Sequence, residues 1–125
     1  RQLDDARFGY GLCRSVSNLD IGQCLALIDK DVIAVEAMEG TDAMIRRAGE
    51  LCRMRGWTLV KVGNIKHDPR FDVPAVGEQT IERLRDAGCG CLALEAGKVM
   101  MLDRVRVLDA AERAGIAVVG IEVTA

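Results

Sequence analysis

The sequence predicts an α/β domain: a mixed, mainly parallel sheet flanked by helices, with one antiparallel hairpin near the N-terminal side. Three observations support this fold class. Helical and strand patterns alternate through the second half of the chain, which is typical of parallel strands joined by right-handed crossovers. Several strands are almost wholly apolar, as expected for a sheet covered on both faces. Finally, 125 residues make one ordinary domain, and with 50% hydrophobic but only 3% aromatic residues the core consists mainly of aliphatic side chains.

The first half of the chain predicts a helix, a hairpin and a second helix. Apolar residues recur at steps of three and four over residues 2–17, which fits one face of a helix. Strand patterns over 23–28 and 32–37 are separated by a short polar connector, which predicts an antiparallel hairpin. Residues 43–54 form an amphipathic helix that ends near Gly56.

The second half begins with a β-branched strand over residues 58–62. Residues 63–77 then contain both prolines and no periodicity, and a loop of this length in a compact domain is usually functional or disordered. The remaining pattern predicts a helix capped by Asp103 and stopped by Gly115, together with four other elements. These are a helix over 78–87, strands over 91–95 and 99–102, and a final apolar strand over 116–123.

Composition excludes several classes of protein. A net charge of −2, a pI near 5.4 and few aromatic residues argue against nucleic-acid binding. The high hydrophobic content argues against disorder, and no apolar run approaches the roughly 20 residues that span a bilayer. Five cysteines in apolar surroundings predict reduced thiols in a cytoplasmic protein, and His67 is the only histidine, so a zinc site is not expected. The chain begins at Arg1 without Met or signal peptide, so we expect that an N-terminal part is missing.

The first candidate site is the turn Glu39-Gly40-Thr41-Asp42, which follows a predicted strand and opens a helix. Thr41 or Asp42 is suited to cap that helix, and the free amides of a helix start suit a phosphate oxygen. The carboxylates of Glu39 and Asp42, with Glu36 nearby, suit Mg²⁺. A plain helix cap is the alternative interpretation.

The second candidate site is the segment that begins at Lys61 and includes Asp68, Arg70 and Asp72, followed by Thr80. The Arg70 guanidinium is suited to bind a phosphate, and the two aspartates are suited to bind metal or to orient a water. A structural loop with a surface ion pair is the alternative. Acidic residues gather in 29–42 and basic residues in 46–70, a distribution that suits a phosphoanhydride substrate bound with a metal.

Several motifs, in order along nearly the whole chain, resemble the UDP-2,3-diacylglucosamine pyrophosphatases of lipid A synthesis. They are Asp20-Ile21-Gly22-Gln23, Val35-Glu36-Ala37-Met38-Glu39-Gly40-Thr41-Asp42, Val60-Lys61-Val62, Arg70-Phe71-Asp72-Val73-Pro74 with Val76-Gly77 and Thr80, Leu94-Glu95-Ala96-Gly97, and Ala117-Val118-Val119-Gly120. The resemblance implies that residues 1–125 are a single domain, the C-terminal catalytic domain of a two-domain enzyme whose N-terminal domain is absent. The isolated domain is then expected to be inactive. Residues 63–68 depart from the family's Lys-Pro and Gln-Asp pattern, which leaves room for a changed substrate.

The implied reaction is Mg²⁺-dependent hydrolysis of UDP-2,3-diacylglucosamine to UMP and 2,3-diacylglucosamine 1-phosphate. The two candidate sites and the resemblance together assign roles to the matched residues. These are catalysis for Asp72, Arg70 and Lys61, substrate binding for Gly40, Thr41, Asp68, Thr80 and Glu95, and metal binding for Asp72, Asp42 and Glu39. The expected substrate is a lipid-linked nucleotide sugar, and no nucleic acid is expected as a partner. We also expect a homodimer and a peripheral contact with the inner membrane. The alternative is a non-enzymatic domain that binds a nucleotide sugar or phospholipid, or that dimerises. All site assignments require the turn at Thr41 and the segment with Asp72 to lie side by side.

Overall fold

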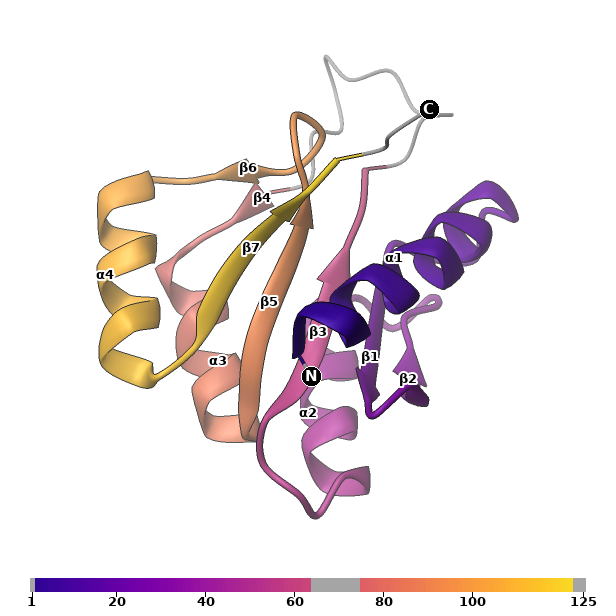
Figure 1. Ribbon diagram of the computed structural model, residues 1–125, viewed down its shortest axis with the longest axis horizontal. Coiled ribbons are helices and arrows are strands. Elements are labelled where there is room, and N and C mark those ends of the chain that lie inside the picture. The colour runs from indigo at the N-terminus through magenta and orange to yellow at the C-terminus, as the bar shows by residue number, and fades with distance from the viewer. Residues whose placement is uncertain (1, 64–74, 123–125) are drawn as a thin grey trace.

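The computed structural model describes residues 2–63 and 75–122 (Figure 1). The elements alternate between helices and strands much as the sequence predicts. In chain order they are α1 (Gln2–Asn18), β1 (Cys24–Ile28), β2 (Asp31–Val35), α2 (Thr41–Leu51), β3 (Trp57–Lys61), β4 (Ala75–Val76), α3 (Glu78–Ala87), β5 (Cys89–Glu95), β6 (Met100–Met101), α4 (Arg104–Ala114) and β7 (Ala117–Ile121).

The main sheet has the strand order β2-β1-β3-β5-β7. Strand β1 is antiparallel to both of its neighbours, whereas β3, β5 and β7 pair in parallel. This confirms the mixed, mainly parallel sheet and the hairpin near the N-terminal side. Because only β1 runs in the opposite direction, β2, β3, β5 and β7 all end at one edge of the sheet, which we call the carboxyl edge.

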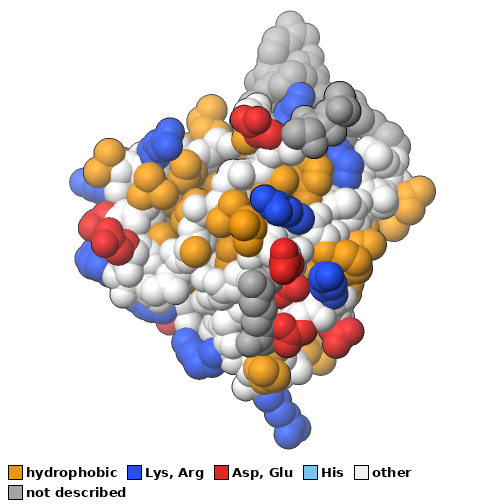
Figure 2. Space-filling model, viewed as in Figure 1, with side chains coloured by type: hydrophobic (Ala, Val, Ile, Leu, Met, Phe, Trp, Pro, Cys, Tyr) orange, Lys and Arg blue, Asp and Glu red, His pale blue; other side chains and the backbone are white. Residues whose placement is uncertain are grey.

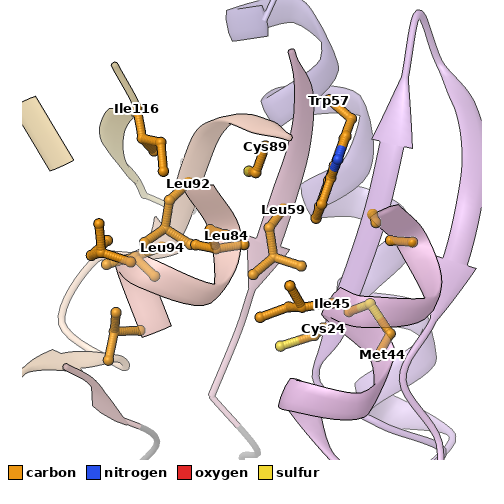
Figure 3. Close-up of a cluster of buried hydrophobic side chains, with 14 of the residues drawn as sticks. Cys24, Met44, Ile45, Trp57, Leu59, Leu84, Cys89, Leu92, Leu94 and Ile116 are labelled. Carbon is orange, nitrogen blue, oxygen red and sulfur yellow. The ribbon is translucent and has the colours of Figure 1, made fainter. Parts of the chain in front are cut away.

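Helices cover the two faces of this sheet unequally. Helix α1 lies on one face, where Gly9 approaches β1 so closely that an added Cβ would lie 2.8 Å from the Leu27 side chain. Helices α2, α3 and α4 cover the other face (Figure 1) and bury the larger hydrophobic cluster, part of which is drawn in Figure 3. Within it, Trp57 is fully buried and its indole Nε1 donates to the carbonyl of Ala87, 3.0 Å away, which ties β3 to the end of α3.

Helix ends follow the sequence prediction in α3 and α4 but not in α2. The side chain of Asp103 accepts a hydrogen bond from the Arg106 N–H, and Gly88 and Gly115 end α3 and α4 in the left-handed conformation. The prediction that Thr41 or Asp42 caps α2 is wrong. Gly40 is the N-cap residue, with φ at 89°, and it offers no side-chain hydrogen bond. The chain turns into α2 through a conformation that glycine adopts readily, so the helix begins without a side-chain cap.

Two further details differ from the sequence pattern. The short strand β4 falls in the predicted loop and pairs in parallel with β6, a pairing between segments that lie far apart in the sequence. Strand β7 is an edge strand whose residues remain partly exposed, so the expectation that this apolar strand is buried on both faces is wrong. The cysteines are free, and four of the five are buried, which agrees with the predicted reduced thiols.

Gly22 provides a test of the packing where β1 begins. A Cβ at this position would lie 1.9 Å from the carbonyl oxygen of Glu36, so the backbone must move to accommodate Gly22→Ala. We expect this substitution to lower the free energy of unfolding by about 2–4 kcal/mol, measured by urea denaturation. The matched control is Gly11→Ala in α1, where an added Cβ meets no atom within 4 Å. This control should raise the stability by up to about 1 kcal/mol. Equal effects of the two substitutions would contradict the packing described here.

Candidate functional site at the carboxyl edge

Three connections meet at the carboxyl edge of the sheet. Residues 36–40 follow β2, Lys61 ends β3, and Glu95 ends β5. Backbone hydrogen bonds join the ends of β2 and β3 to the start of β1. The Val62 N–H donates to the Gln23 carbonyl, and the Glu36 N–H donates to the Cys24 carbonyl. In open α/β sheets ligands bind beyond the carboxyl ends of the strands, so a ligand site is expected at this edge.

The turn after β2 is held by Glu36. Its carboxylate accepts hydrogen bonds from the Thr41 hydroxyl and from the N–H of Gln23, the latter at 3.0 Å. The motif that ends at Gln23 is therefore in contact with the motif that contains Glu36 and Thr41, and the Glu36 carboxylate orients the Thr41 side chain. Glu36 lies close in sequence to the predicted metal ligands, but its contacts in the described structure hold the turn together.

Two helices begin at this edge with glycine caps. Helix α2 follows Gly40 and α3 follows Gly77, and neither cap has a side-chain hydrogen bond. The first backbone bond of α2 runs from the Met44 N–H to Gly40, and in α3 the Thr80 N–H donates to Gly77 at 3.1 Å. The first-turn amides of α2 are thus left without a side-chain cap, an arrangement that favours anions.

Lys61 and Thr41 lie on either side of Cys24. Lys61 is paired in register with Cys24 across β1 and β3, and the Cys24 sulfur lies 3.7 Å from the Thr41 hydroxyl. Burial raises the pKa of the Cys24 thiol to about 12, although the Lys61 charge and the Thr41 hydrogen bond act in the opposite direction. The thiol therefore stays protonated at neutral pH and serves as packing between the two polar residues. The Lys61 ammonium also donates to the carbonyl of Ala75, 3.4 Å away.

The predicted metal ligands Glu39 and Asp42 each lie beside an arginine. Glu39 accepts from Arg47 at 2.9 Å and from the N–H of Ala37, whereas Asp42 is 3.6 Å from Arg83 and is 54% exposed. Within residues 2–63 and 75–122, no group of three or more His, Cys, Asp or Glu side chains is arranged to hold a metal ion.

Glu95 forms a buried clamp, a feature that the sequence analysis missed. Its carboxylate, only 3% exposed, accepts hydrogen bonds at 2.8–2.9 Å from Arg14, and also from the Tyr10 hydroxyl and from the N–H of Gly63 at 3.0 Å. The Arg14 guanidinium also donates to the Gly63 carbonyl at 2.9 Å and to Ser17. We call Arg14, Glu95, Tyr10 and Gly63 the Arg14–Glu95 clamp. The available signal was the placement of Arg14 four residues after Tyr10 and beside Cys13, on the face of the predicted helix that carries the apolar stripe.

The clamp shifts the ionisation of both acidic partners. Burial alone would raise the pKa of Glu95, but the hydrogen bonds from Tyr10, Arg14 and the Gly63 amide outweigh it and hold the pKa below its usual 4.5. Burial, together with the hydrogen bond and the charge of Glu95, raises the pKa of Tyr10 to about 12. At neutral pH the pair is thus an ionised carboxylate and a neutral phenol, with its acceptor sites occupied by protein donors.

Asp68, Arg70 and Asp72 lie outside the described residues. The described residues on either side of their segment are Gly63, held in the clamp, and Ala75, which accepts from Lys61. Gly63 leaves no room for a side chain, because a Cβ there would lie 2.9 Å from the Cβ of Lys98. Both flanking residues are therefore fixed at the edge where α2 begins.

A hollow between α2 and α3 begins at this edge, beside Asp42, and extends away from it. Its volume is about 710 Å³, and it runs between α2 and α3 from Asp42 and Arg83 to Arg55 and Gly88. Among its lining residues Arg46 and Arg53 add positive charge, but Glu50 and Asp86 offset it. We place the candidate site at the carboxyl edge because Thr41, Lys61 and Glu95 lie there, whereas Asp42 is the one predicted site residue among those that line the described hollow.

Fold and edge together define an α/β domain whose carboxyl edge carries a lysine and two helix starts with glycine at the N-cap. The chain belongs to the family described as the LpxI C-terminal domain, whose model matches residues 1–119. It is 37% identical over 118 residues to the UDP-2,3-diacylglucosamine pyrophosphatase LpxI of Caulobacter vibrioides. That match covers 89% of this chain and 42% of the relative, so the chain spans about two fifths of the relative's length.

A solved structure supports the fold alone. RibD of Acinetobacter baumannii matches with a TM-score of 0.55 at 15% identity, over 96% of this chain and 36% of RibD. In the part of the chain that the structure describes, no helix has the length and apolar character needed to cross a membrane.

The buried carboxylate of the clamp makes stability depend on pH. We expect Glu95→Gln to lower the free energy of unfolding by about 2–4 kcal/mol at pH 7, because Arg14 loses its charged partner. Because the pKa of Glu95 is lower in the folded protein, the stability difference between wild type and Glu95→Gln is complete above pH 4.5. The difference declines as the pH falls through the folded-state pKa of Glu95. Chemical denaturation of both proteins from pH 3 to 8 measures this difference.

Glu39→Gln is the matched control for that experiment. It removes a carboxylate from a more exposed ion pair with Arg47 and should change stability by less than about 0.5 kcal/mol. A Glu95→Gln effect that is as small as the control's, or one that grows at acidic pH, would contradict the clamp.

Proposed function

We propose that the protein containing this chain hydrolyses the pyrophosphate bond of UDP-2,3-diacylglucosamine in lipid A biosynthesis, giving UMP and 2,3-diacylglucosamine 1-phosphate. The supporting observation is the 37% identity to a pyrophosphatase of that name over 118 residues, a match that covers 89% of this chain. The chain corresponds to 42% of that relative, so we expect the remainder of the protein to complete the substrate cleft. Since the substrate is a membrane lipid, we further propose a cytoplasmic enzyme that contacts the inner membrane peripherally.

The geometry of the described residues supports a phosphate position between α2 and β3. The amides after Gly40 and the Lys61 ammonium are donors on two sides of Cys24, and both suit a phosphoryl oxygen. Thr41 contributes its backbone amide, while its hydroxyl donates to Glu36 and so holds the turn in place. These groups stabilise the charge that develops on the phosphoryl oxygens, and in our proposal Arg70 joins them.

Magnesium fits the carboxylates available near this position only in part. Asp42 is exposed and its ion pair with Arg83 is long, so its oxygens remain accessible, whereas one Glu39 oxygen already accepts from Arg47 and Ala37. We therefore propose Asp42 and Asp72 as the principal ligands, with Glu39 secondary. When bound, Mg²⁺ would neutralise the pyrophosphate and lower the pKa of a bound water. Asp72 would serve as a ligand or would position the attacking water.

Glu95 has a different role in this proposal. Its carboxylate oxygens accept from Arg14, Tyr10 and Gly63, so Glu95 acts on the substrate through the backbone it holds. Thr80 lies in the first turn of α3, where its N–H donates to Gly77, and in our proposal its hydroxyl is the group that contacts the substrate.

Substitution of the two central residues tests the proposed reaction in the full-length protein. We expect Asp72→Ala to abolish UMP release and Lys61→Ala to lower kcat about 10²–10³-fold, since each removes a group that stabilises the reacting phosphate. Arg113→Ala is the control, because this exposed arginine at the end of α4 lies at the opposite edge of the sheet and pairs only with Asp109 among the described residues. Wild-type protein that binds the nucleotide sugar without hydrolysing it would instead support a non-enzymatic binding domain.

Removal of divalent cations tests the metal requirement separately. We expect chelation with EDTA to stop UMP release and added Mg²⁺ to restore it, because the pyrophosphate charge is then neutralised again. Asp42→Asn should raise the Mg²⁺ concentration needed for half-maximal rate about tenfold. Full activity in EDTA, or an unchanged Mg²⁺ dependence in Asp42→Asn, would contradict the assigned ligands.

A further inference from the structure

The turn between β5 and β6 carries Lys98 at the carboxyl edge. The carbonyl of Glu95 accepts from the N–H of Lys98 at 3.1 Å, and Gly97 takes a left-handed φ of 77° between them. The N–H of Ala96 donates to Ile121 at 2.8 Å, which ties the same turn to the end of β7. Backbone hydrogen bonds therefore fix the position of Lys98, although its side chain is exposed. The phosphate position described above uses Lys61 and makes no use of Lys98.

Lys98 and Lys61 lie at the ends of adjacent strands. Lys61 pairs in register with Leu94 across β3 and β5. Beyond this pair the two connections touch, since a Cβ on Gly63 would lie 2.9 Å from the Cβ of Lys98 and 3.1 Å from its carbonyl oxygen. Figure 1 shows the turn between β5 and β6 at the same end of the sheet as the end of β3. The two lysines thus lie on either side of Gly63.

Carboxylates near the two lysines already have partners in the protein. Four of them accept hydrogen bonds from protein donors or lie beside arginines, namely Glu36, Glu39, Asp42 and Glu95. Glu122, which follows β7, lines a hollow on the α1 side of the sheet together with Arg7. The negative charges described at this edge therefore face arginines and other protein donors rather than the two lysines.

Both lysines keep their charge available to a ligand. Within residues 2–63 and 75–122 neither forms an ion pair with a carboxylate, and the contact of the Lys61 ammonium with Ala75 is to a neutral carbonyl. Figure 2 shows Lys or Arg side chains at the surface of the end of the molecule toward which β3 and β5 run. An ammonium group offers three N–H donors and suits a phosphate oxygen. Two such groups at one edge suit a ligand that carries two phosphates.

Glu95 sets the relative position of the two lysines. Its carboxylate accepts from the N–H of Gly63, which follows Lys61 in the chain, and its carbonyl accepts from the N–H of Lys98. The carboxylate is held in turn by Arg14. One residue of the Arg14–Glu95 clamp is therefore bonded to both connections, so the separation of the two lysines is set by the fold before a ligand binds.

We propose that Lys98 binds the second phosphate of a nucleoside diphosphate group whose first phosphate lies between α2 and Lys61. This inference rests on the proposed function, in which the first amides of α2 and Lys61 receive the phosphate that remains in UMP. The second phosphate, which carries the sugar, then lies beside the turn between β5 and β6. There the Lys98 ammonium donates to its oxygens, so both negatively charged groups of the pyrophosphate have a lysine partner.

Calorimetric titration of the full-length protein with UDP and with UMP tests this role. UDP carries both phosphates, whereas UMP carries only the first. We expect Lys98→Gln to raise the Kd for UDP about tenfold or more and the Kd for UMP less than about twofold, because it removes the charge at the second phosphate. Lys98→Arg should keep the Kd for UDP within about threefold of wild type. Both substitutions retain the Cβ that contacts Gly63, and circular dichroism confirms that each variant is folded.

Lys30→Gln is the matched control for this experiment. It removes an exposed ammonium from the turn between β1 and β2, at the opposite edge of the sheet, where Lys30 lies over the ring of Phe8. It should change neither dissociation constant.

Two kinds of failure are distinguishable. Lys98→Gln that weakens UDP no more than Lys30→Gln does, or that weakens UMP equally, would overturn the role of Lys98 and leave the proposed function intact. The same holds for wild-type protein that hydrolyses UDP-2,3-diacylglucosamine but binds UDP no more tightly than UMP. Wild-type protein that binds neither nucleotide and releases no UMP would contradict the proposed function, and this inference with it.

Discussion

The Arg14–Glu95 clamp is the interaction on which the arrangement of the carboxyl edge depends. It joins α1, the end of β5 and Gly63, the second residue after β3, and these lie far apart in the sequence. Both backbone groups of Gly63 are held by this ion pair, and the turn at Lys98 packs against the same residue. A buried ion pair is a weak source of net stability, but breaking it is costly, so it favours a single geometry over its alternatives. Gly63 therefore leaves the sheet in one fixed direction, two residues beyond Lys61.

Local patterns were sufficient to predict most of the fold. The hairpin followed from a polar connector between two apolar strands, and the boundaries of α3 and α4 followed from periodicity and from Gly88, Asp103 and Gly115. The cap of α2 could not be chosen correctly, because Thr41 is a good capping residue whose hydroxyl is instead taken by Glu36. Strand β4 was missed because its pairing with β6 is set by tertiary contacts rather than by any local repeat. The exposure of β7 was not predicted, because an apolar strand has the same sequence pattern at the centre of a sheet and at its edge.

The candidate site was predictable in outline and not in detail. Strand direction alone places Lys61, Glu95 and the start of α2 at one edge, as the sequence order implied. The distinction between a substrate ligand and a structural carboxylate depends on partners such as Arg14, which is 81 residues away from Glu95. Membership of the LpxI C-terminal domain family adds the reaction that this edge is proposed to perform.

The central claim is that the carboxyl edge, between Gly40 and Lys61, receives the phosphate of the substrate. A crystal structure of the full-length protein with Mg²⁺ and UMP tests it most directly. We expect a phosphate oxygen within about 3.2 Å of the first amides of α2 and of the Lys61 ammonium. A phosphate bound instead in the hollow between α2 and α3, against Arg53 and Arg55, would contradict it.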